Sequence, residues 1–149
     1  MSLSIRQADL SDLEQVAPLF DLYRQFYGKN PDPEGSRTFL LERLRHFEST
    51  IFLAFENAAP AGFIQLYPSF SSVSAARIFI LNDLFVLPTH RKKGLGKALL
   101  EKAREFGNAH GAVRLALSTA VDNRSAQSLY SALGWKQNTQ FLNYELALP

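Results

Sequence analysis

The chain has 149 residues, 46% of them hydrophobic, which predicts one domain over residues 1–149 with a proper core. Its 16 basic and 14 acidic residues leave a formal net charge of only +2, which argues against a nucleic-acid partner because the phosphate backbone rewards a concentrated basic face. The absence of cysteine excludes disulfides, thiolate nucleophiles and cysteine-ligated zinc. Because the sequence has no signal-peptide pattern and no apolar run of membrane-spanning length, we expect a cytoplasmic protein without a membrane partner.

The N-terminal half alternates between strand and helix patterns. Residues 4–8 predict a short strand, and the capping-box pattern from Ser11 to Glu14 predicts the start of a helix that ends near Gly28. A second amphipathic helix is expected from about Pro33 to Ser49. The strands expected at 51–55 and 61–67, with a turn at 56–60, predict a hairpin, and the serine-rich residues 69–74 predict a loop.

The C-terminal half begins with the most apolar strand pattern, residues 78–87. A helix follows from Gly94 to about His110, then a strand at 113–118 and a helix from Asn123 to Leu133, which Gly134 ends. Two short strands are expected at 135–138 and 141–148, with a turn at 137–140. The predicted order is β-α-α-β-β-β-α-β-α-β-β, an α/β (α+β) protein with a mixed sheet flanked by helices.

The segment between the strand at 78–87 and the next helix is a candidate phosphate site. Gly94 and Gly96 allow the loop to close tightly and to aim backbone N–H groups at an anion. The first N–H groups of the helix lack intrahelical partners and lie at the positive end of its dipole. Arg91, Lys92 and Lys93 add positive charge, although a solvated loop is the alternative for this triplet. We therefore predict a ligand with a pyrophosphate.

Two other phosphate loops do not fit this segment. A nucleotide P-loop requires Ser or Thr after its Gly-Lys pair, whereas Ala98 follows Gly96-Lys97. The dinucleotide fingerprint would place Leu99 at its third glycine, where close helix packing needs a small residue. What remains is Arg-x-x-Gly-x-Gly between a strand and a helix.

Two motifs, in this order, resemble those of the GCN5-related N-acetyltransferases (GNAT). The first is Leu81-Asn82-Asp83-Leu84-Phe85-Val86 with Arg91-x-x-Gly94-x-Gly96-x-x-Leu99-Leu100, and the second is Asn123-x-x-Ala126-x-x-Leu129-Tyr130-x-x-Leu133-Gly134-Trp135. The element order resembles the family over the whole chain, which implies a GNAT-type, mostly antiparallel sheet. The first motif and residues 140–144 look most like the branch with yeast histone and D-amino-acid acetyltransferases, with diamine acetyltransferases more distant.

The resemblance implies an acetyl-CoA site, with coenzyme A as product and no metal. It implies that the strand at 78–87 splays from its neighbour, so that the backbone of Leu84 and Val86 binds the thioester carbonyl and the pantetheine arm. It also implies that the Leu84 N–H stabilises the oxyanion of the tetrahedral intermediate. Asn123 would contact the cofactor arm, or serve as a simple helix N-cap, or both. The full set implied to bind the cofactor is Leu84, Phe85, Val86, Arg91, Lys92, Lys93, Gly94, Leu95, Gly96, Lys97, Asn123, Ser125 and Tyr130.

Proton transfer has two candidates. Tyr130 occupies the family's position for the acid that protonates the CoA thiolate; without the resemblance, packing of its helix on the sheet is the alternative. Asp83 is either the base that deprotonates the amine, directly or through a water molecule, or a structural acceptor. Asn82 stands where diamine acetyltransferases tend to carry a glutamate and cannot act as a base. Tyr23, Phe26 and Tyr27 are candidates for the acceptor pocket together with Asn82, although core packing is expected for at least two of the three aromatic residues.

These observations favour an acetyl-CoA-dependent N-acetyltransferase that works by direct attack in a ternary complex. Its acceptor is expected to be a small amine, amino acid or polyamine rather than a protein lysine, because no long acidic patch is present to dock a basic peptide. The alternative is a non-catalytic acyl-CoA-binding sensor or subunit, and a nucleotide-binding module is a minor third reading. Widely separated histidines and the lack of a Gly-x-Ser-x-Gly elbow at Ser118 argue against a zinc enzyme and a serine hydrolase. The aromatic surface of residues 141–148 suits a homodimer interface, with an ordinary sheet edge as the alternative.

Overall fold

The computed structural model describes residues 2–149, which fall into two compact units, residues 2–118 and Thr119–Pro149. The expectation of one domain stays a prediction. No helix within residues 2–149 is long and apolar enough to cross a membrane. The first unit contains β1 (Leu3–Gln7), η1 (Leu10–Asp12), α1 (Leu13–Phe26), α2 (Pro33–Arg45), β2 (Thr50–Glu56), β3 (Ala59–Ser71), β4 (Ala76–Val86), η2 (Pro88–His90), α3 (Leu95–Ala109) and β5 (Ala112–Ala116), and the second contains α4 (Arg124–Ala132).

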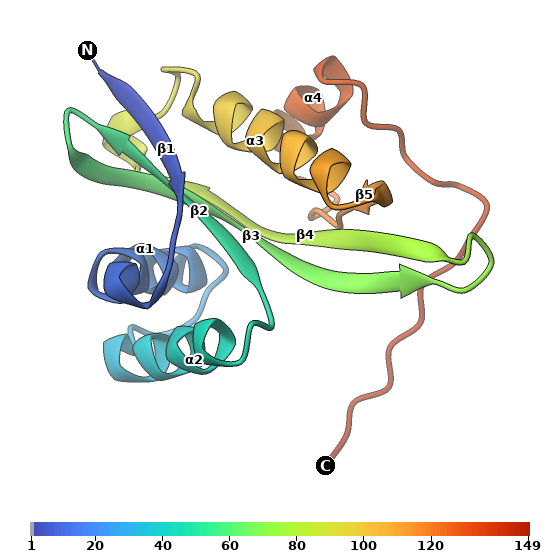
Figure 1. Cartoon of the computed structure of the whole chain (residues 1–149), viewed down its shortest axis with the longest axis horizontal. Coiled ribbons are helices and arrows are strands. Elements are labelled where there is room, and N and C mark those ends of the chain that lie inside the picture. Colours follow the sequence, from blue (N-terminus) through green and yellow to red (C-terminus); the bar gives the residue numbers. More distant parts are fainter. Residues whose placement is uncertain (1) are drawn as a thin grey trace. The chain divides into compact units, whose positions relative to one another are not determined.

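The first unit is a sheet in the order β1-β2-β3-β4-β5 with helices on both faces. Strands β1 to β4 pair antiparallel with their neighbours, whereas β5 pairs parallel with β4. Figure 1 shows α1 and α2 on one face of this sheet and α3 on the other. The predicted fold class, a mixed and mostly antiparallel sheet flanked by helices, is therefore confirmed.

Both faces of the sheet are apolar because both are covered. On one face, Val16 and Leu40 from the two N-terminal helices pack with Leu53 and Phe63 of the sheet in one buried cluster. On the other face, the ring of Phe106 on α3 lies 5.6 Å from that of Phe52 and 5.1 Å from that of Phe79. Burial on both sides explains why residues 51–56 of β2 are buried without alternation.

Local structure in the N-terminal half differs from the prediction at three places. The capping box is formed by Asp9 and Asp12 instead of Ser11 and Glu14, with Asp9 Oδ1 accepting from the Ser11 backbone N–H at 2.8 Å. The hairpin turn is shorter than expected, because Asn57 and Ala58 both adopt positive φ and let β3 begin at Ala59. The expected loop at 69–74 is also shorter, since residues 69–71 still pair with β4.

The two C-terminal strands that the sequence predicts are absent from the described chain. Residues 135–149 form no helix or strand, and Phe141, Leu142, Tyr144, Leu146 and Leu148 are between 71% and 88% exposed. Alternating apolar and polar residues favour a strand only where another strand offers its backbone groups, and no strand pairs with residues 141–148 in the described residues. This part of the prediction is wrong for the structure.

Candidate active site

The backbone between β4 and α3 has the form of an anion-binding loop. Lys92 has φ 62° and Gly94 has φ 86°, so left-handed residues turn the chain just before α3 begins at Leu95. Gly94 is the N-cap of α3, and no side chain among the described residues caps that helix end. A Cβ placed on Gly94 would meet nothing within 4 Å, so the loop backbone faces open space. The N-terminal N–H groups of a 15-residue helix are thus presented to a ligand.

The Arg91 side chain turns back along β4. Its Nε donates to the carbonyl oxygen of Val86 at 2.9 Å. Its guanidinium carbon lies 5.7 Å from the ring centre of Phe85 and 5.8 Å from that of Phe26 on α1. Arg91 therefore ties the loop to the end of β4 and to α1, whereas Lys92 and Lys97 are exposed beside the loop backbone.

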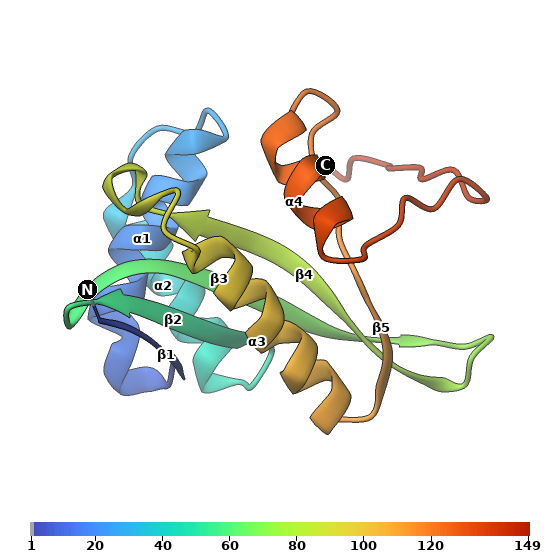
Figure 2. The same ribbon diagram turned by 90° about the horizontal axis from the view of Figure 1, so that it is seen from above.

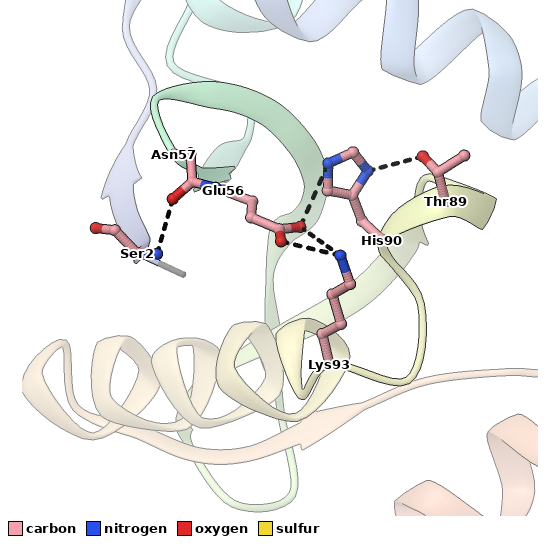
Figure 3. A network of polar contacts seen from close by, with 6 residues as sticks. All are labelled: Ser2, Glu56, Asn57, Thr89, His90 and Lys93. Atoms are coloured by element: carbon pink, nitrogen blue, oxygen red, sulfur yellow. Dashed lines mark hydrogen bonds and ion pairs between the residues drawn. The ribbon is translucent and has the colours of Figure 1, made fainter.

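The third basic residue of the loop, Lys93, is engaged by a buried carboxylate that the sequence analysis did not identify. Lys93 Nζ lies 3.0 Å from Oε1 and 3.3 Å from Oε2 of Glu56, the last residue of β2. Nε2 of His90 lies 3.3 Å from Oε2 of the same carboxylate (Figure 3). Glu56 is only 7% exposed. Lys93 therefore contributes an ion pair within the protein, and not the free charge that the sequence suggested.

Strand β4 carries a bulge beside this loop. Gln65 of β3 pairs with Asp83, but the next residue, Leu66, pairs with Leu81, so Asn82 is the extra residue on β4. Beyond the bulge, Leu87 N–H donates to the carbonyl of Ala61 at 2.8 Å. Because backbone groups alternate sides along a strand, those of Leu84 and Val86 point away from β3.

Among the described residues, no strand lies beside that outward edge of β4 at residues 81–86. Strand β5 pairs with β4 only at Arg77, Phe79 and Ile80, and the two strands diverge beyond this point (Figure 2). Residues 81–86 of β4 are therefore paired on one side only, within residues 2–118 of the first unit. An extended ligand arm can add to this edge as another strand does.

Asp83 is the centre of a buried polar cluster at the bulge. It is 1% exposed and accepts hydrogen bonds from Gln65 Nε2 and from Asn82 Nδ2, the latter at 2.8 Å. Burial raises the pKa of the Asp83 carboxyl, and the hydrogen bonds from Asn82, Gln65 and Tyr23 oppose this shift. Gln65 Oε1 is buried and has no hydrogen-bond partner among the described residues.

Two tyrosines border this cluster. The Tyr23 hydroxyl donates to the carbonyl of Asn82 at 3.1 Å. Burial and the nearby Asp83 carboxylate raise the pKa of both Tyr23 and Tyr67, so both phenols stay protonated at neutral pH. The cluster thus places the Tyr23 hydroxyl beside one buried carboxylate that is a candidate proton acceptor.

The three aromatic residues near the end of α1 do not behave alike. Tyr23 is partly buried and its ring packs 5.9 Å from Phe63, whereas Phe26 and Tyr27 are 58% and 53% exposed. Core packing, expected for at least two of them, therefore holds for Tyr23 alone. The Tyr23 and Tyr27 rings meet edge to face at 5.1 Å, which forms a continuous aromatic surface from Asn82 toward solvent.

The remaining candidates lie in the second unit. Asn123 is the N-cap of α4, and its Oδ1 accepts from the Ala126 backbone N–H at 3.3 Å. Ser125 lies in the first turn of this helix and Tyr130 in its last part. The Tyr130 ring lies 5.9 Å from that of Trp135, and the carbonyl of Tyr130 accepts from the Trp135 N–H at 3.0 Å.

Four residues that were not predicted from the sequence lie around the loop between β4 and α3 and around the Asp83 cluster. They are Glu56, His90, Gln65 and Tyr67. Glu56 lies 37 positions before Lys93, and no motif links the two. Gln65 and Tyr67 belong to an ordinary apolar strand pattern and gain a role only through their pairing with β4. Among residues 2–149, no group of three or more His, Cys, Asp or Glu side chains is arranged to hold a metal ion.

Comparisons with known proteins agree with the geometry. A sequence profile described as the acetyltransferase (GNAT) family matches residues 16–135. The uncharacterized N-acetyltransferase YhfO of Bacillus subtilis is 48% identical over 147 residues, covering 99% of each chain. The aminoalkylphosphonate N-acetyltransferase of Salmonella typhimurium is 30% identical over 135 residues, covering 90% of this chain and 85% of that one. The crystal structure of a probable acetyltransferase superposes with a TM-score of 0.93 at 44% identity, covering 98% of each chain.

Proposed function

The chain belongs to the acetyltransferase (GNAT) family and is an acetyl-CoA-dependent N-acetyltransferase, and we propose that its acceptor is the primary amine of a small molecule, such as an amino acid or a polyamine. The observation that carries this proposal is the buried Asp83 carboxylate beside the open edge of β4. A relative with 30% identity takes its name from a small amine, an aminoalkylphosphonate. The narrower placement in the branch with yeast histone and D-amino-acid acetyltransferases stays a prediction, as does the cytoplasmic location.

The loop and the edge of β4 fit the two halves of acetyl-CoA. The uncapped N–H groups at the start of α3 and the exposed Lys92 and Lys97 suit the pyrophosphate. The outward backbone groups of Leu84 and Val86 suit the amides of the pantetheine arm, and Leu84 N–H is proposed to polarise the thioester carbonyl. Because Arg91 already donates to the Val86 carbonyl, the Val86 N–H is the group proposed to bind the arm.

Asp83 is proposed as the base that removes a proton from the acceptor ammonium. An ammonium has no lone pair with which to attack, so one proton must leave before transfer. The raised pKa of Asp83 makes it a better proton acceptor than an exposed aspartate. Since the carboxylate is 1% exposed, we propose that the proton reaches it through a water bonded to the unpaired Gln65 Oε1.

Tyr130 is proposed as the acid that protonates the CoA thiolate as the amine attacks. This role rests on its position in the family motif, together with Asn123 and Ser125 as cofactor contacts. A phenol hydroxyl can donate a proton to a thiolate leaving group. The reaction then needs no covalent enzyme intermediate, because the amine attacks the thioester directly.

A homodimer is also part of the proposal. Leu142, Tyr144, Leu146 and Leu148 alternate with polar residues or alanine, and all four are more than 80% exposed. Such a row of apolar side chains is typical of a strand that pairs with another chain. Light scattering of the full chain should give a dimer mass, and Leu146→Asp should give a monomer; a monomeric full chain would refute this part.

Thermal unfolding with acetyl-CoA tests the function. At about a hundred times its Kd, a specific ligand adds about 2.7 kcal/mol of stability. The expected upward shift in Tm should be lost in Gly96→Glu, which places a carboxylate at the N-terminus of α3. Amines are then screened for release of the CoA thiol. A shift without turnover of any amine would favour a non-catalytic acyl-CoA sensor, and no shift would refute the proposal.

A further inference from the structure

The carboxylate of Glu56 connects the sheet to the phosphate loop, residues 91–94 between η2 and α3. It lies between Lys93 Nζ, at 3.0 Å and 3.3 Å from its two oxygens, and His90 Nε2, at 3.3 Å (Figure 3). We propose that Glu56 is a positioning residue that holds the phosphate loop in its anion-binding shape through these two side chains. The inference rests on the proposed binding of acetyl-CoA at this loop.

The loop needs such a brace because its shape is strained. Lys92 adopts φ 62°, a left-handed conformation in which its Cβ crowds the backbone. Strained residues persist only where the surrounding structure leaves them no alternative. His90 and Lys93 lie on either side of the segment Arg91–Lys92, so one carboxylate fixes both ends of it.

Glu56 is itself held rigidly at a corner of the sheet. It is the last residue of β2 and pairs with Leu3 on one side and Ala59 on the other. The following residue, Asn57, makes two hydrogen bonds with Ser2. The Asn57 N–H donates to the Ser2 carbonyl at 2.8 Å, and the Ser2 N–H donates to Asn57 Oδ1 at 2.9 Å (Figure 3). Positions of side chains on such paired backbone vary little, which is what a brace requires.

The His90 ring is oriented from its other side. Its Nδ1 lies 2.9 Å from the hydroxyl of Thr89, so both ring nitrogens have partners. Glu56, His90 and Thr89 thus form a chain of contacts from β2 to η2, which leads directly into the loop. Lys93 adds a second contact past the strained residue.

The negative charge of Glu56 allows two roles of Lys93 to be distinguished by whether acetyl-CoA affinity rises or falls when that charge is removed. If Lys93 served mainly as a phosphate ligand, Glu56 would compete with the phosphate for it, and Glu56→Gln would tighten acetyl-CoA binding. If Glu56 is a brace, removing either partner lets the loop relax, and binding weakens in both variants. The two readings therefore predict opposite effects of Glu56→Gln.

The experiment measures acetyl-CoA affinity by calorimetry, and the kinetics of transfer, for Glu56→Gln, Lys93→Met and the double variant. Each single change should raise Kd and KM about tenfold with kcat almost unchanged, and the double variant should bind no worse than either single one. If Glu56→Gln folds poorly, His90→Gln keeps the test valid, because it removes one contact of Glu56 and leaves Lys93 in place, so that only the brace predicts weaker acetyl-CoA binding. Glu14→Gln, which removes the exposed ion pair to Arg37, is the matched control and should leave Kd unchanged.

A short acetyl donor without a pyrophosphate separates positioning from general damage. With S-acetyl-N-acetylcysteamine, kcat/KM of Glu56→Gln should equal that of the wild type, because this donor does not use the loop. Tighter acetyl-CoA binding by Glu56→Gln, additive losses in the double variant, or an equal loss with the short donor would overturn the inference. Wild-type protein that fails to bind acetyl-CoA would instead overturn the proposed function and the inference with it.

Discussion

The Gly94→Ala variant distinguishes the role of the phosphate loop in binding acetyl-CoA from the contribution of Gly94 to protein stability. At φ 86°, an alanine suffers left-handed strain of about 1–2 kcal/mol, while the stiffer unfolded chain returns about 0.4–1 kcal/mol. Apart from Gly94 itself and its two chain neighbours, no described residue has an atom within 4 Å of the added Cβ, so packing adds no further cost. The expected loss is about 1 kcal/mol, or a fall in Tm of about 3 °C for a chain of this size.

Gly111→Ala provides the matched control. Gly111 has φ 73° and also meets nothing within 4 Å, but it follows the C-terminal end of α3, about 22 Å of helix away from Gly94. Both variants should lose similar stability. Only Gly94→Ala should weaken acetyl-CoA binding, because an alanine that leaves the left-handed region misaligns the loop N–H groups.

Calorimetry and thermal unfolding check both halves of this prediction. Losing one hydrogen bond to a charged phosphate costs about 1.5–3 kcal/mol, so Kd should rise at least about tenfold in Gly94→Ala and stay constant in Gly111→Ala. Equal changes in Kd for the two variants, or wild-type affinity in Gly94→Ala, would refute the assignment of the pyrophosphate to this loop.

Three further changes test the rest of the site. Asp83→Asn should lower turnover by about a hundredfold or more and should remove the rise of kcat/KM with pH. Because burial raises the folded-state pKa of Asp83, the contribution of this carboxyl to stability falls as pH increases from about 4 through that pKa. The variant should therefore melt no lower than the wild type at pH 8, and a large loss of Tm would show a structural role. Tyr130→Phe should lower kcat by about a hundredfold at constant acetyl-CoA KM, and unchanged kcat in steady-state assays would exclude Tyr130 as the acid. Gly62→Ala places a Cβ 2.6 Å from the Phe85 carbonyl oxygen, so it should destabilise the protein by about 1–3 kcal/mol in denaturant unfolding and raise acetyl-CoA KM, whereas a wild-type midpoint would show that β3 can shift freely.

Local patterns predicted the elements that carry their own signals. The spacing of Leu13, Val16 and Phe20 predicted α1, and the glycines of the loop predicted where α3 begins. The bulge at Asn82 was beyond such patterns, since it is a register shift between β3 and β4 and leaves no mark on either strand alone. The family motif nevertheless identified Leu84 and Val86, whose backbone groups do face the open edge.

Contacts between distant residues explain the remaining differences. Glu56 ends an ordinary strand pattern, and its ion pair with Lys93 joins residues 37 positions apart. Asp9 and Ser11 are both good helix-capping residues three positions before an acid, and the prediction of Ser11 and Glu14 was wrong because the sequence pattern fits both pairs. The alternation at 141–148 describes side chains that suit a strand, but a strand also needs a partner.

The divergence of β5 from β4 also affects how the protein keeps itself from aggregating. Residues 81–86 of β4 form a largely apolar strand whose outer backbone groups have no neighbouring strand among residues 2–149, and such an edge is a template for pairing with other chains. Arg91 protects one position by donating to the Val86 carbonyl, and the exposed Asn82 interrupts the apolar run. A cofactor bound along this edge would shield the rest. With the proposed binding mode, acetyl-CoA would then influence the solubility of the protein as well as its rate of turnover.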